Sequence, residues 1–546
     1  MAKQSTKYIF IVGGVMSGVG KGTSAAAIGR LLKSKGFEVT AVKMDPYVNV
    51  DAGTMNPVEH GEVFVTDDGD ETDQDIGNYE RFLDVDILSV NYMTTGRVYQ
   101  TVINRERALE YGGKCVEVVP HVPEEIIRRI KNAAKHSKAD FVIVEIGGTV
   151  GEYQNILFLE AARTMKYENP DDVLFVLVSY LPIPSQLGEM KTKPTQYASR
   201  TLNAAGIQAD FIVARSEQPV DEPRKKKMSV LCNVHAQDII SSPNVASVYE
   251  VPVVYDDQDL GTKILRKVGL KARKNAFNSW RAWNKEIKGY KKEVHIGVLG
   301  KYFSSGNFVL SDVYISVIES IKHAAWANSR KPVLTWLNSE DYEKDPKKLK
   351  ELSKFDGIIV PGGFGSRAVE GIIEAIEYVR LHKIPYLGLC YGMQLATIEF
   401  ARHVAGLKTA NTTEISSKTS HPVIHIMPEQ EKKLLDNDYG NSMRLGAYPC
   451  VLKDGTLSAK AYGKGDISER HRHRYEFNND YREKLAEKGL VIAGTSPDGH
   501  LVEIVELPAD KHPFFVGVQF HPEFKSRPQK PHPLFKEFVR VAIKAK

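Results

Sequence analysis

The stretch IVGGVMSGVGKGT, residues 11–23, joins an apolar run to an Ala/Leu-rich helix and decides the fold of the first half of the chain. Glycines in such a loop let backbone N–H groups converge on phosphate oxygens, and the helix N-terminus adds partial positive charge. Lys21 would then reach the outer phosphates. The pattern departs from a strict G-x-x-x-x-G-K-[ST] sequence, because Val15 replaces the first glycine and Gly22 stands where serine or threonine is usual. A tight strand-to-helix turn is the alternative, but glycines, lysine and context together favour a nucleotide site.

Short β-branched runs alternate with helical stretches on either side of this loop. Their near-continuous apolar character is typical of parallel strands that are buried on both faces. The predicted strands are Lys7–Val12, Val39–Lys43, Phe141–Ile146, Val173–Ser179 and Phe211–Arg215. We therefore expect an α/β, P-loop-like and Rossmannoid domain with a parallel sheet.

Residues 263–293 change character, because they are strongly basic and carry Trp280 and Trp283 at helical spacing. A linker helix that docks two aromatic side chains explains this better than a nucleic-acid patch does. The strand pattern restarts with VHIGVLG, residues 294–300. The expected organisation is a first domain over 1–266, a linker over 267–292 and a second α/β domain over 293–546.

Composition excludes several classes of protein. A length of 546 residues exceeds what one hydrophobic core usually serves. The formal net charge of +5 is too mild for a nucleic-acid-binding surface. No uninterrupted apolar run approaches the ~18 residues of a membrane span, and the first apolar run passes straight into the glycine-rich loop rather than into a cleavage site. Four cysteines are too few for a disulfide scaffold, so we expect a cytoplasmic protein without membrane or nucleic-acid partners.

A magnesium site should accompany a triphosphate. Glu145 ends the apolar strand FVIVEIGG, residues 141–148, and Asp75 lies in ETDQDIGNYE, residues 71–80. Both are candidate ligands. Other acidic residues crowd the same loop, and spacing alone does not choose among them: Asp67, Asp68, Asp70, Glu71 and Asp73.

GLCYG, residues 388–392, follows an apolar strand and precedes a helix. This is the nucleophile-elbow pattern with cysteine in place of serine, and a helix start stabilises both a thiolate and an oxyanion. His521 and Glu523 supply a base and the carboxylate that orients it. PGGFG, residues 361–365, offers backbone N–H groups for an oxyanion hole.

A lone cysteine is usually a small buried hydrophobe, and that is our interpretation of Cys115, Cys232 and Cys450. At Cys390 the elbow, the histidine–glutamate pair and the glycine turn agree. They predict thioester-forming acyl transfer, with glutamine hydrolysis as the first candidate reaction.

Together these segments resemble the CTP synthase family over nearly the whole chain. The stretches that carry the resemblance are KMDPYVNVDAGTMNPVEHGEVFVTDDGDETDQD (43–75), EIGGTVGE (145–152), KTKPTQ (191–196), PGGFG (361–365), GLCYGMQL (388–395), ERHRHRYEFNN (469–479) and QFHPEF (519–524). KTKPTQ and ERHRHRYE are the most specific. GLCYGMQ and QFHPE alone indicate only a class I glutamine amidotransferase.

The resemblance implies a ligase of pyrimidine biosynthesis. The N-terminal synthetase domain would phosphorylate O4 of UTP with ATP and Mg²⁺, and the C-terminal class I glutamine amidotransferase domain would hydrolyse L-glutamine. Ammonia would pass through an internal tunnel and displace the phosphate, giving CTP, ADP and phosphate. Allosteric activation by GTP, inhibition by CTP, a homotetramer and filaments also belong to the expectation.

The resemblance also assigns residues by position. Catalytic positions are Cys390, His521 and Glu523. ATP-binding positions are Gly18, Val19, Gly20, Lys21, Gly22, Thr23, Lys43, Asp75 and Val245. UTP- or CTP-binding positions are Ser17, Glu152, Tyr153, Gln154, Lys191, Thr192, Lys193, Pro194, Thr195, Gln196 and Lys227. Glutamine-binding positions are Gly363, Tyr391, Gly392, Met393, Gln394, Glu414 and Arg474. Asp75 and Glu145 would bind the metal, His60 would gate the tunnel, and Phe364 and Arg367 would contact GTP.

The chain departs from the family pattern at three places. Glu152-Tyr153-Gln154 replaces Asp-Ile-Glu, Tyr391 replaces a leucine, and Ser366 replaces a tyrosine. Two other functions compete with the main one. Another ATP-dependent amidoligase with a fused glutaminase, such as a cobyrinate-type amidase, should lack KTKPTQ, and a catalytically silent scaffold should lack the intact candidate site residues.

Overall fold

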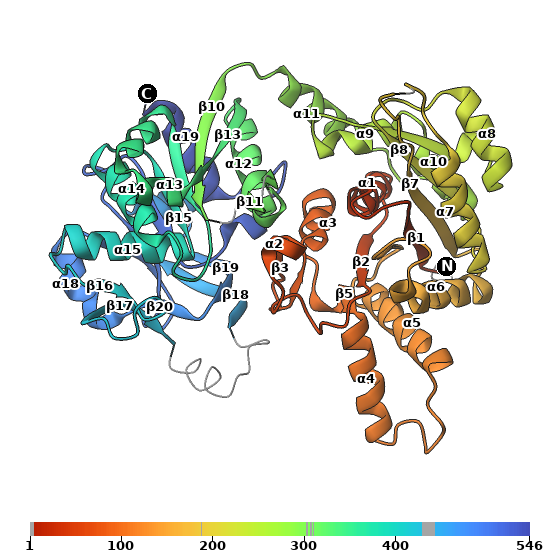
Figure 1. The fold of residues 1–546 in the computed structure, drawn as a ribbon, viewed down its shortest axis with the longest axis horizontal. Helices are drawn as coiled ribbons and strands as arrows, with labels where there is room; N and C mark the ends of the chain where they lie inside the picture. Colours follow the sequence, from red (N-terminus) through yellow and green to blue (C-terminus); the bar gives the residue numbers. More distant parts are fainter. Residues whose placement is uncertain are drawn as a thin grey trace. The chain divides into compact units, whose positions relative to one another are not determined.

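The computed structural model describes residues 5–186, 188–301, 304–305, 308–309, 311–427 and 443–545 (Figure 1). The chain forms two compact units. The first contains residues 1–51 and 75–286, and the second contains residues 52–74 and 287–546. The short segment 52–74 therefore belongs with the second half of the chain. Within the described ranges, no helix combines the length and the apolar character needed to cross a membrane.

The first unit is built on a seven-stranded sheet in the order β5-β2-β6-β1-β7-β8-β9. Every neighbouring pair in it is parallel, which confirms the predicted parallel α/β fold. The strands are β1 (Lys7–Gly14), β2 (Val39–Asp45), β5 (Tyr92–Thr94), β6 (Phe141–Ile146), β7 (Val173–Tyr180), β8 (Phe211–Ser216) and β9 (Ile239–Pro243).

Helices lie between these strands and after the last of them (Figure 1). They are α1 (Lys21–Ser34), α3 (Asp75–Leu83), α4 (Thr95–Arg107), α5 (Val118–His136), α6 (Ile156–Glu168), α7 (Lys193–Ala204), α8 (Glu222–Cys232), α9 (Val251–Asp256), α10 (Leu260–Lys267) and α11 (Asn278–Gly289). Strand order reverses around β1, so the connections after β1 and β7 run to opposite sides of the sheet. Open α/β sheets bind ligands beside such a reversal, outside the carboxyl ends of the strands. Trp280 of α11 is buried, and its Nε1 donates to the Tyr249 carbonyl at 3.0 Å.

The second unit has a mixed nine-stranded sheet in the order β13-β10-β14-β15-β23-β22-β21-β18-β19. Its parallel part comprises β10 (Glu293–Gly300), β13 (Lys331–Asn338), β14 (Gly357–Val360), β15 (Tyr386–Leu389) and β23 (Phe515–Val518). Its antiparallel part comprises β18 (Arg444–Leu452), β19 (Asp466–His473), β21 (Val491–Thr495) and β22 (Val502–Glu506).

Helices and short strands complete this unit. The helices are α2 (Pro57–His60), α12 (Ile315–Ala327), α13 (Ser339–Lys344), α14 (Val369–Leu381), α15 (Tyr391–His403), α17 (Leu457–Tyr462), α18 (Arg482–Glu487) and α19 (Pro533–Lys544). Small sheets pair β3 (Val63–Val65) with β4 (Glu71–Asp73), β11 (Ser304–Ser305) with β12 (Phe308–Val309), and β16 (Ala410–Thr412) with β17 (His421–Ile426) and β20 (Tyr475–Phe477).

Candidate functional site

The predicted phosphate loop runs from β1 into α1. Gly18 and Gly20 have φ angles of 70° and 91°, and Val15 has a φ of 81° although it carries a β-branched side chain. Lys21 is buried in the first turn of α1 and its Nζ donates to the Gly148 carbonyl at 2.8 Å. The predicted ATP residues Gly18 to Thr23 thus occupy the loop and the helix start that follow the central strand.

Gly22 departs from the usual serine or threonine for a steric reason. A Cβ atom at this position would overlap the carboxylate of Asp75. The first turn of α3, where Asp75 lies, therefore packs directly against the first turn of α1. Here the carboxylate of Asp75 occupies the space next to the phosphate loop that a hydroxyl side chain would fill in a strict P-loop sequence.

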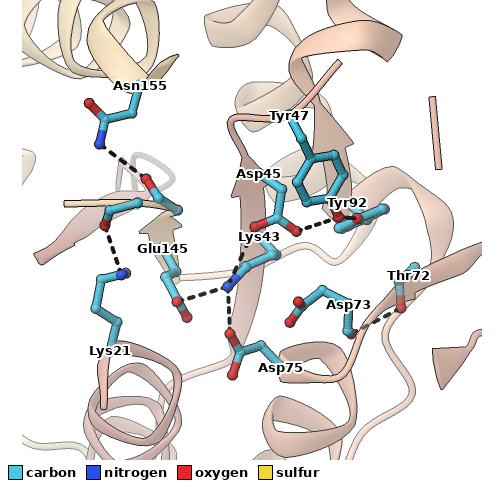
Figure 2. A network of polar contacts seen from close by, with 12 residues as sticks. Lys21, Lys43, Asp45, Tyr47, Thr72, Asp73, Asp75, Tyr92, Glu145 and Asn155 are labelled. Carbon is cyan, nitrogen blue, oxygen red and sulfur yellow. Dashed lines mark hydrogen bonds and ion pairs between the residues drawn. The ribbon is translucent and has the colours of Figure 1, made fainter. Parts of the chain in front are cut away.

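The two candidate metal ligands meet at one ammonium group (Figure 2). Nζ of Lys43, on β2, lies 2.5 Å from Oδ2 of Asp75 and 2.9 Å from Oε1 of Glu145 on β6. Glu145 is buried and also accepts a hydrogen bond from the Tyr79 hydroxyl. Asp45 lies 3.6 Å from the same nitrogen. The predicted residues Lys43, Asp75 and Glu145 are therefore brought together.

The electrostatics of this cluster favour a cation. Burial raises the pKa of Glu145, and the neighbouring Asp75 raises it further. Burial also opposes ionisation of Asp75, but the Lys43 ammonium outweighs it and holds that pKa below its usual range. Burial lowers the pKa of Lys21. Carboxylate oxygens that already share a positive charge are donors of the kind that Mg²⁺ prefers, so these residues fit the implied metal.

A cavity of the first unit adjoins the phosphate loop. It has a volume of about 300 Å³, and its lining includes Gly20, Thr23, Arg215 and the predicted adenine contact Val245. Arg215 was not anticipated from the sequence. Its guanidinium donates to the carbonyls of Ser242 and Pro243 at 3.0 and 3.1 Å, which fixes it at the carboxyl ends of β8 and β9. Its place near the end of an apolar strand, β8, was the available signal.

The predicted UTP residues lie in four separate places. Thr192 to Gln196 form the start of α7, where the Gln196 amide donates to the Thr192 hydroxyl at 2.9 Å and Ser179 of β7 donates to Thr195 at 2.9 Å. Glu152 accepts the backbone N–H of Thr149 at 2.9 Å after β6, and Tyr153 beside it is 94% exposed.

The remaining members of this set are also placed. Ser17 is exposed in the phosphate loop, Gln154 is exposed beside Tyr153, and Lys227 lies on α8. Lys191 pairs with Glu189 at 2.6 Å instead of with the other predicted residues. Glu152 and Tyr153 line one cavity of about 710 Å³.

The candidate nucleophile stands at a sharp turn between β15 and α15. Cys390 has a φ of 48°, a backbone conformation that residues other than glycine seldom adopt. Its N–H donates to the Val518 carbonyl at 2.7 Å. A Cβ at Gly388 would lie 2.7 Å from the carbonyl carbon of Gly392, and a Cβ at Gly392 would overlap the Val360 carbonyl. The two glycines of GLCYG are therefore required by close backbone approach, as in a nucleophile elbow.

Three neighbouring parallel strands bring the rest of this site together. PGGFG follows β14, Cys390 follows β15 and His521 follows β23, so their carboxyl ends meet at one edge. Cys390, His521 and Glu523 line one cavity of about 90 Å³ with Gly362 and Gly363. Nδ1 of His521 lies 2.7 Å from Oε1 of Glu523, which leaves Nε2 for the nucleophile.

Burial lowers the pKa of His521, but the Glu523 carboxylate and the Cys390 thiol outweigh it and raise that pKa to about 10. In Glu523→Gln the main raising charge is lost, so the His521 pKa should fall. The alkaline limb of the glutaminase pH–rate profile should then move to lower pH than in the unchanged protein. Rates measured from about pH 6 to about pH 11 check this, with the exposed Glu487→Gln as control. An unmoved alkaline limb would mean that Glu523 does not set the protonation of His521.

Four predicted glutamine contacts share a second cavity, of about 230 Å³, with Cys390: Gly363, Gln394, Glu414 and Arg474. Gln394 donates to the Tyr475 carbonyl at 2.9 Å, and Glu414 accepts the N–H of Gly365 at 2.7 Å. Met443, Arg472, His473 and Tyr475 also line this cavity and were not predicted. The predicted Tyr391, Gly392 and Met393 lie in the first turn of α15 and do not line it.

Segment 52–74 forms one wall of the cavity at Cys390 through Pro57, Glu62 and Val63. Arg470 pairs with Asp67, and Nε of Arg472 lies 2.7 Å from Oε1 of Glu71. His60, the predicted tunnel gate, is absent from the described lining of this cavity, and its Nε2 lies 3.5 Å from Oδ2 of Asp73. The acidic residues 67 and 71, which spacing could not separate from metal ligands, therefore pair with arginines of β19.

Fold and site define a class of protein: a nucleotide-binding α/β unit joined to a cysteine-dependent glutamine amidotransferase. Residues 7–270 match the family described as CTP synthase N-terminus, and residues 309–541 match glutamine amidotransferase class-I. CTP synthase of Carboxydothermus hydrogenoformans is 50% identical over 540 residues, 99% of both chains. That of Clostridium acetobutylicum is 49% identical over 542 residues, again 99% of both. The chain belongs to the CTP synthase family.

A solved structure, the glutaminase domain of Trypanosoma brucei CTPS with bound acivicin, is 36% identical. It covers 46% of this chain and 94% of its own, with a TM-score of 0.42.

Proposed function

We propose that this chain makes CTP from UTP, ATP and glutamine. The observation that carries the proposal is the 50% identity to a CTP synthase across 540 residues, which spans both units rather than the glutaminase alone. The runner-up functions explain only part of this match. Another amidoligase with a fused glutaminase accounts for both domain types but not for KTKPTQ, residues 191–196. A silent scaffold accounts for neither the Cys390 site nor the Lys43 cluster.

In the glutaminase half, the Cys390 thiolate would attack the amide carbon of glutamine. His521, oriented by Glu523, would take the thiol proton and return it to the departing ammonia. Backbone N–H groups of the loop at Gly363 and of the helix start at Tyr391 would bind the oxyanion. Water would then hydrolyse the thioester and release glutamate.

In the synthetase half, Lys21 and Lys43 would hold the phosphates of ATP while its γ-phosphoryl group passes to O4 of UTP. Mg²⁺, which Asp75 and Glu145 would bind, supplies neutralisation of the negative charge on the triphosphate. The 4-phosphoryl group makes that oxygen a good leaving group, so ammonia can displace it at C4. Because ammonia must stay neutral and shielded from water, an internal tunnel fits this chemistry.

The proposal extends to regulation and assembly. UTP and CTP would share the triphosphate site at Lys191 to Gln196 and Lys227. The spread of these residues over separate surfaces supports a homotetramer in which a neighbouring subunit completes the pocket. Sedimentation with and without UTP plus ATP tests this assembly, which ligand should promote. We also propose a synthetase domain over 1–266, a linker over 267–292, an amidotransferase domain over 293–546 and a cytoplasmic location.

GTP is the proposed activator of the glutaminase. Phe364 is 52% exposed beside the Cys390 cavity and could stack on a purine, while Arg367 could meet phosphate. At saturating ATP and UTP, added GTP should raise glutamine turnover about tenfold, an increase within the usual range of allosteric coupling. Phe364→Ala should lose most of this response, whereas the exposed Leu381→Ala should keep it. A rate of glutamine hydrolysis that does not change when GTP is added would refute the assignment.

The experiment that tests the main function measures ADP release with each nitrogen acceptor in turn. ADP should form with UTP and glutamine. It should not form when UTP is replaced by a carboxylate or by a different carbonyl compound as the acceptor. ADP release independent of UTP would favour the other amidoligase. Absence of both ATPase and glutaminase turnover in the pure protein would favour the scaffold.

A further inference from the structure

The peptide groups of Gly365, in the loop after β14, are held at both ends by side chains. Its N–H donates to Oε1 of Glu414 at 2.7 Å. Its carbonyl accepts from Nζ of Lys301 at 2.6 Å and from the hydroxyl of Tyr391 at 2.8 Å. Gly365 has a φ of 78°, so a side chain here would be strained whatever the space around it. The loop that carries the proposed oxyanion N–H groups is thus anchored at Gly365 by three side chains.

Tyr391 joins this anchor to the nucleophile. It follows Cys390 directly, is the first residue of α15 and is 2% exposed. Nζ of Lys301 lies 4.7 Å from the centroid of its ring, and Nη2 of Arg367 donates to the Lys301 carbonyl at 2.5 Å. Lys301, at the end of β10, therefore contacts both the ring and the carbonyl that the hydroxyl bonds. Burial lowers the pKa of this lysine to about 8, with Glu414 opposing and Arg367 adding to the effect.

We propose that the Tyr391 side chain is a positioning residue for glutamine hydrolysis, which latches the loop 361–367 to the start of α15. The two halves of the oxyanion hole come from this loop and from the helix start. Tyr391, at the helix start, donates a hydrogen bond from its hydroxyl to the carbonyl of Gly365 in the loop, 26 residues earlier in the sequence. The inference rests on the proposed glutaminase activity and assigns a role to a side chain that does not line the glutamine cavity.

The physical reason lies in preorganisation. Donors that are already aimed at the developing oxyanion stabilise the transition state without reorganising when the reaction occurs. Loss of the hydroxyl leaves the Gly365 carbonyl with one of its two side-chain donors, so the loop samples more open positions. Because the oxyanion forms only in the transition state, the change should lower kcat and leave KM for glutamine nearly unaltered.

Tyr391→Phe removes the hydrogen bond to the Gly365 carbonyl and keeps the ring. Its glutaminase kcat should fall about tenfold with KM within about twofold of the unchanged protein, since one oxyanion donor is worth more than this and the latch only positions donors. The matched control is Tyr342→Phe. Tyr342 is also buried in the second unit, donates one hydrogen bond, to Glu351 at 2.8 Å, and lines neither cavity at Cys390. The control should keep kcat and KM.

A second measurement does not depend on activity. Amide hydrogen exchange of the peptide covering 361–368 should become about fivefold faster in Tyr391→Phe, and remain unchanged in Tyr342→Phe. Unchanged exchange of this peptide, or an unchanged kcat, overturns the latch. CTP synthesis from added ammonia in the same preparations reports the proposed function separately. Its absence from the unchanged protein would count against that function, while the exchange result would still decide the latch.

Discussion

Cys390→Ala is expected to abolish glutamine-dependent CTP formation, by about 10⁴-fold or more, while leaving synthesis from added ammonia intact. The thioester forms on Cys390, at the end of β15, whereas the phosphate and metal residues belong to the other compact unit. Loss of the nucleophile therefore removes the nitrogen supply without touching activation of the uracil ring.

The matched control for this variant is Cys450→Ala. Cys450 is buried in the same unit, and burial raises the pKa of its thiol above the ordinary value, so it behaves as a small hydrophobe. Cys450→Ala should make CTP from glutamine and from ammonia at nearly the rates of the unchanged protein. Equal loss of the two activities in Cys390→Ala would contradict the division of labour between the units.

Asp75→Asn should reduce CTP formation by about 10³-fold with either nitrogen source. The substitution keeps the size of the side chain that packs against Gly22, but removes the charge that faces Lys43 at 2.5 Å. Phosphoryl transfer then loses the carboxylate that would hold the cation, and ammonia has no activated carbon to attack. Basal glutamine hydrolysis should continue, because it depends on the second unit.

The exposed Asp171→Asn provides the control, and it should leave every activity unchanged. Rates with glutamine and with ammonia, each measured over a range of Mg²⁺ concentrations, check the assignment. If the Asp75→Asn protein makes CTP at the unchanged rate at low Mg²⁺, this carboxylate does not bind the metal.

The strands at the centre of the first sheet were predictable, because parallel strands buried on both faces are near-continuous apolar runs. β6 was predicted over its observed range, Phe141–Ile146, and β1 within two residues at its C-terminal end. The edge strands β5 and β9 were missed. The sequence of β9, IISSP, has only two apolar residues before two serines and a proline, and β5 has three residues, so neither carries a period that separates it from a loop.

Long-range contacts were beyond sequence reasoning. Asp67 and Glu71 lie among closely spaced acids, and only the fold reveals that they pair with Arg470 and Arg472, about 400 residues away. Local backbone requirements were easier to predict, because Gly388 and Gly392 around Cys390 match the pattern of a nucleophile elbow. The need for glycine at position 22 was not, since it arises from a carboxylate on another helix.

The positions of side chains in a pocket follow the same division. Cys390, His521 and the PGGFG loop were expected at one site because each follows an apolar strand and their chemical roles complement one another. The structure brings them together at the aligned carboxyl ends of β14, β15 and β23. The hydroxyl of Tyr391 offered no such signal. Its partner is a backbone carbonyl, which any sequence possesses, so the contact becomes visible only in three dimensions.

The central claim is that nitrogen released at Cys390 reaches C4 of a uridine nucleotide in the same protein. The most direct test incubates the protein with UTP, ATP, Mg²⁺ and glutamine labelled with ¹⁵N in the side-chain amide, and analyses the nucleotides by mass spectrometry. The account predicts CTP that carries the ¹⁵N label, formed together with ADP, phosphate and glutamate in equal amounts. Glutamate formed without any labelled CTP, with UTP recovered unchanged, would contradict it.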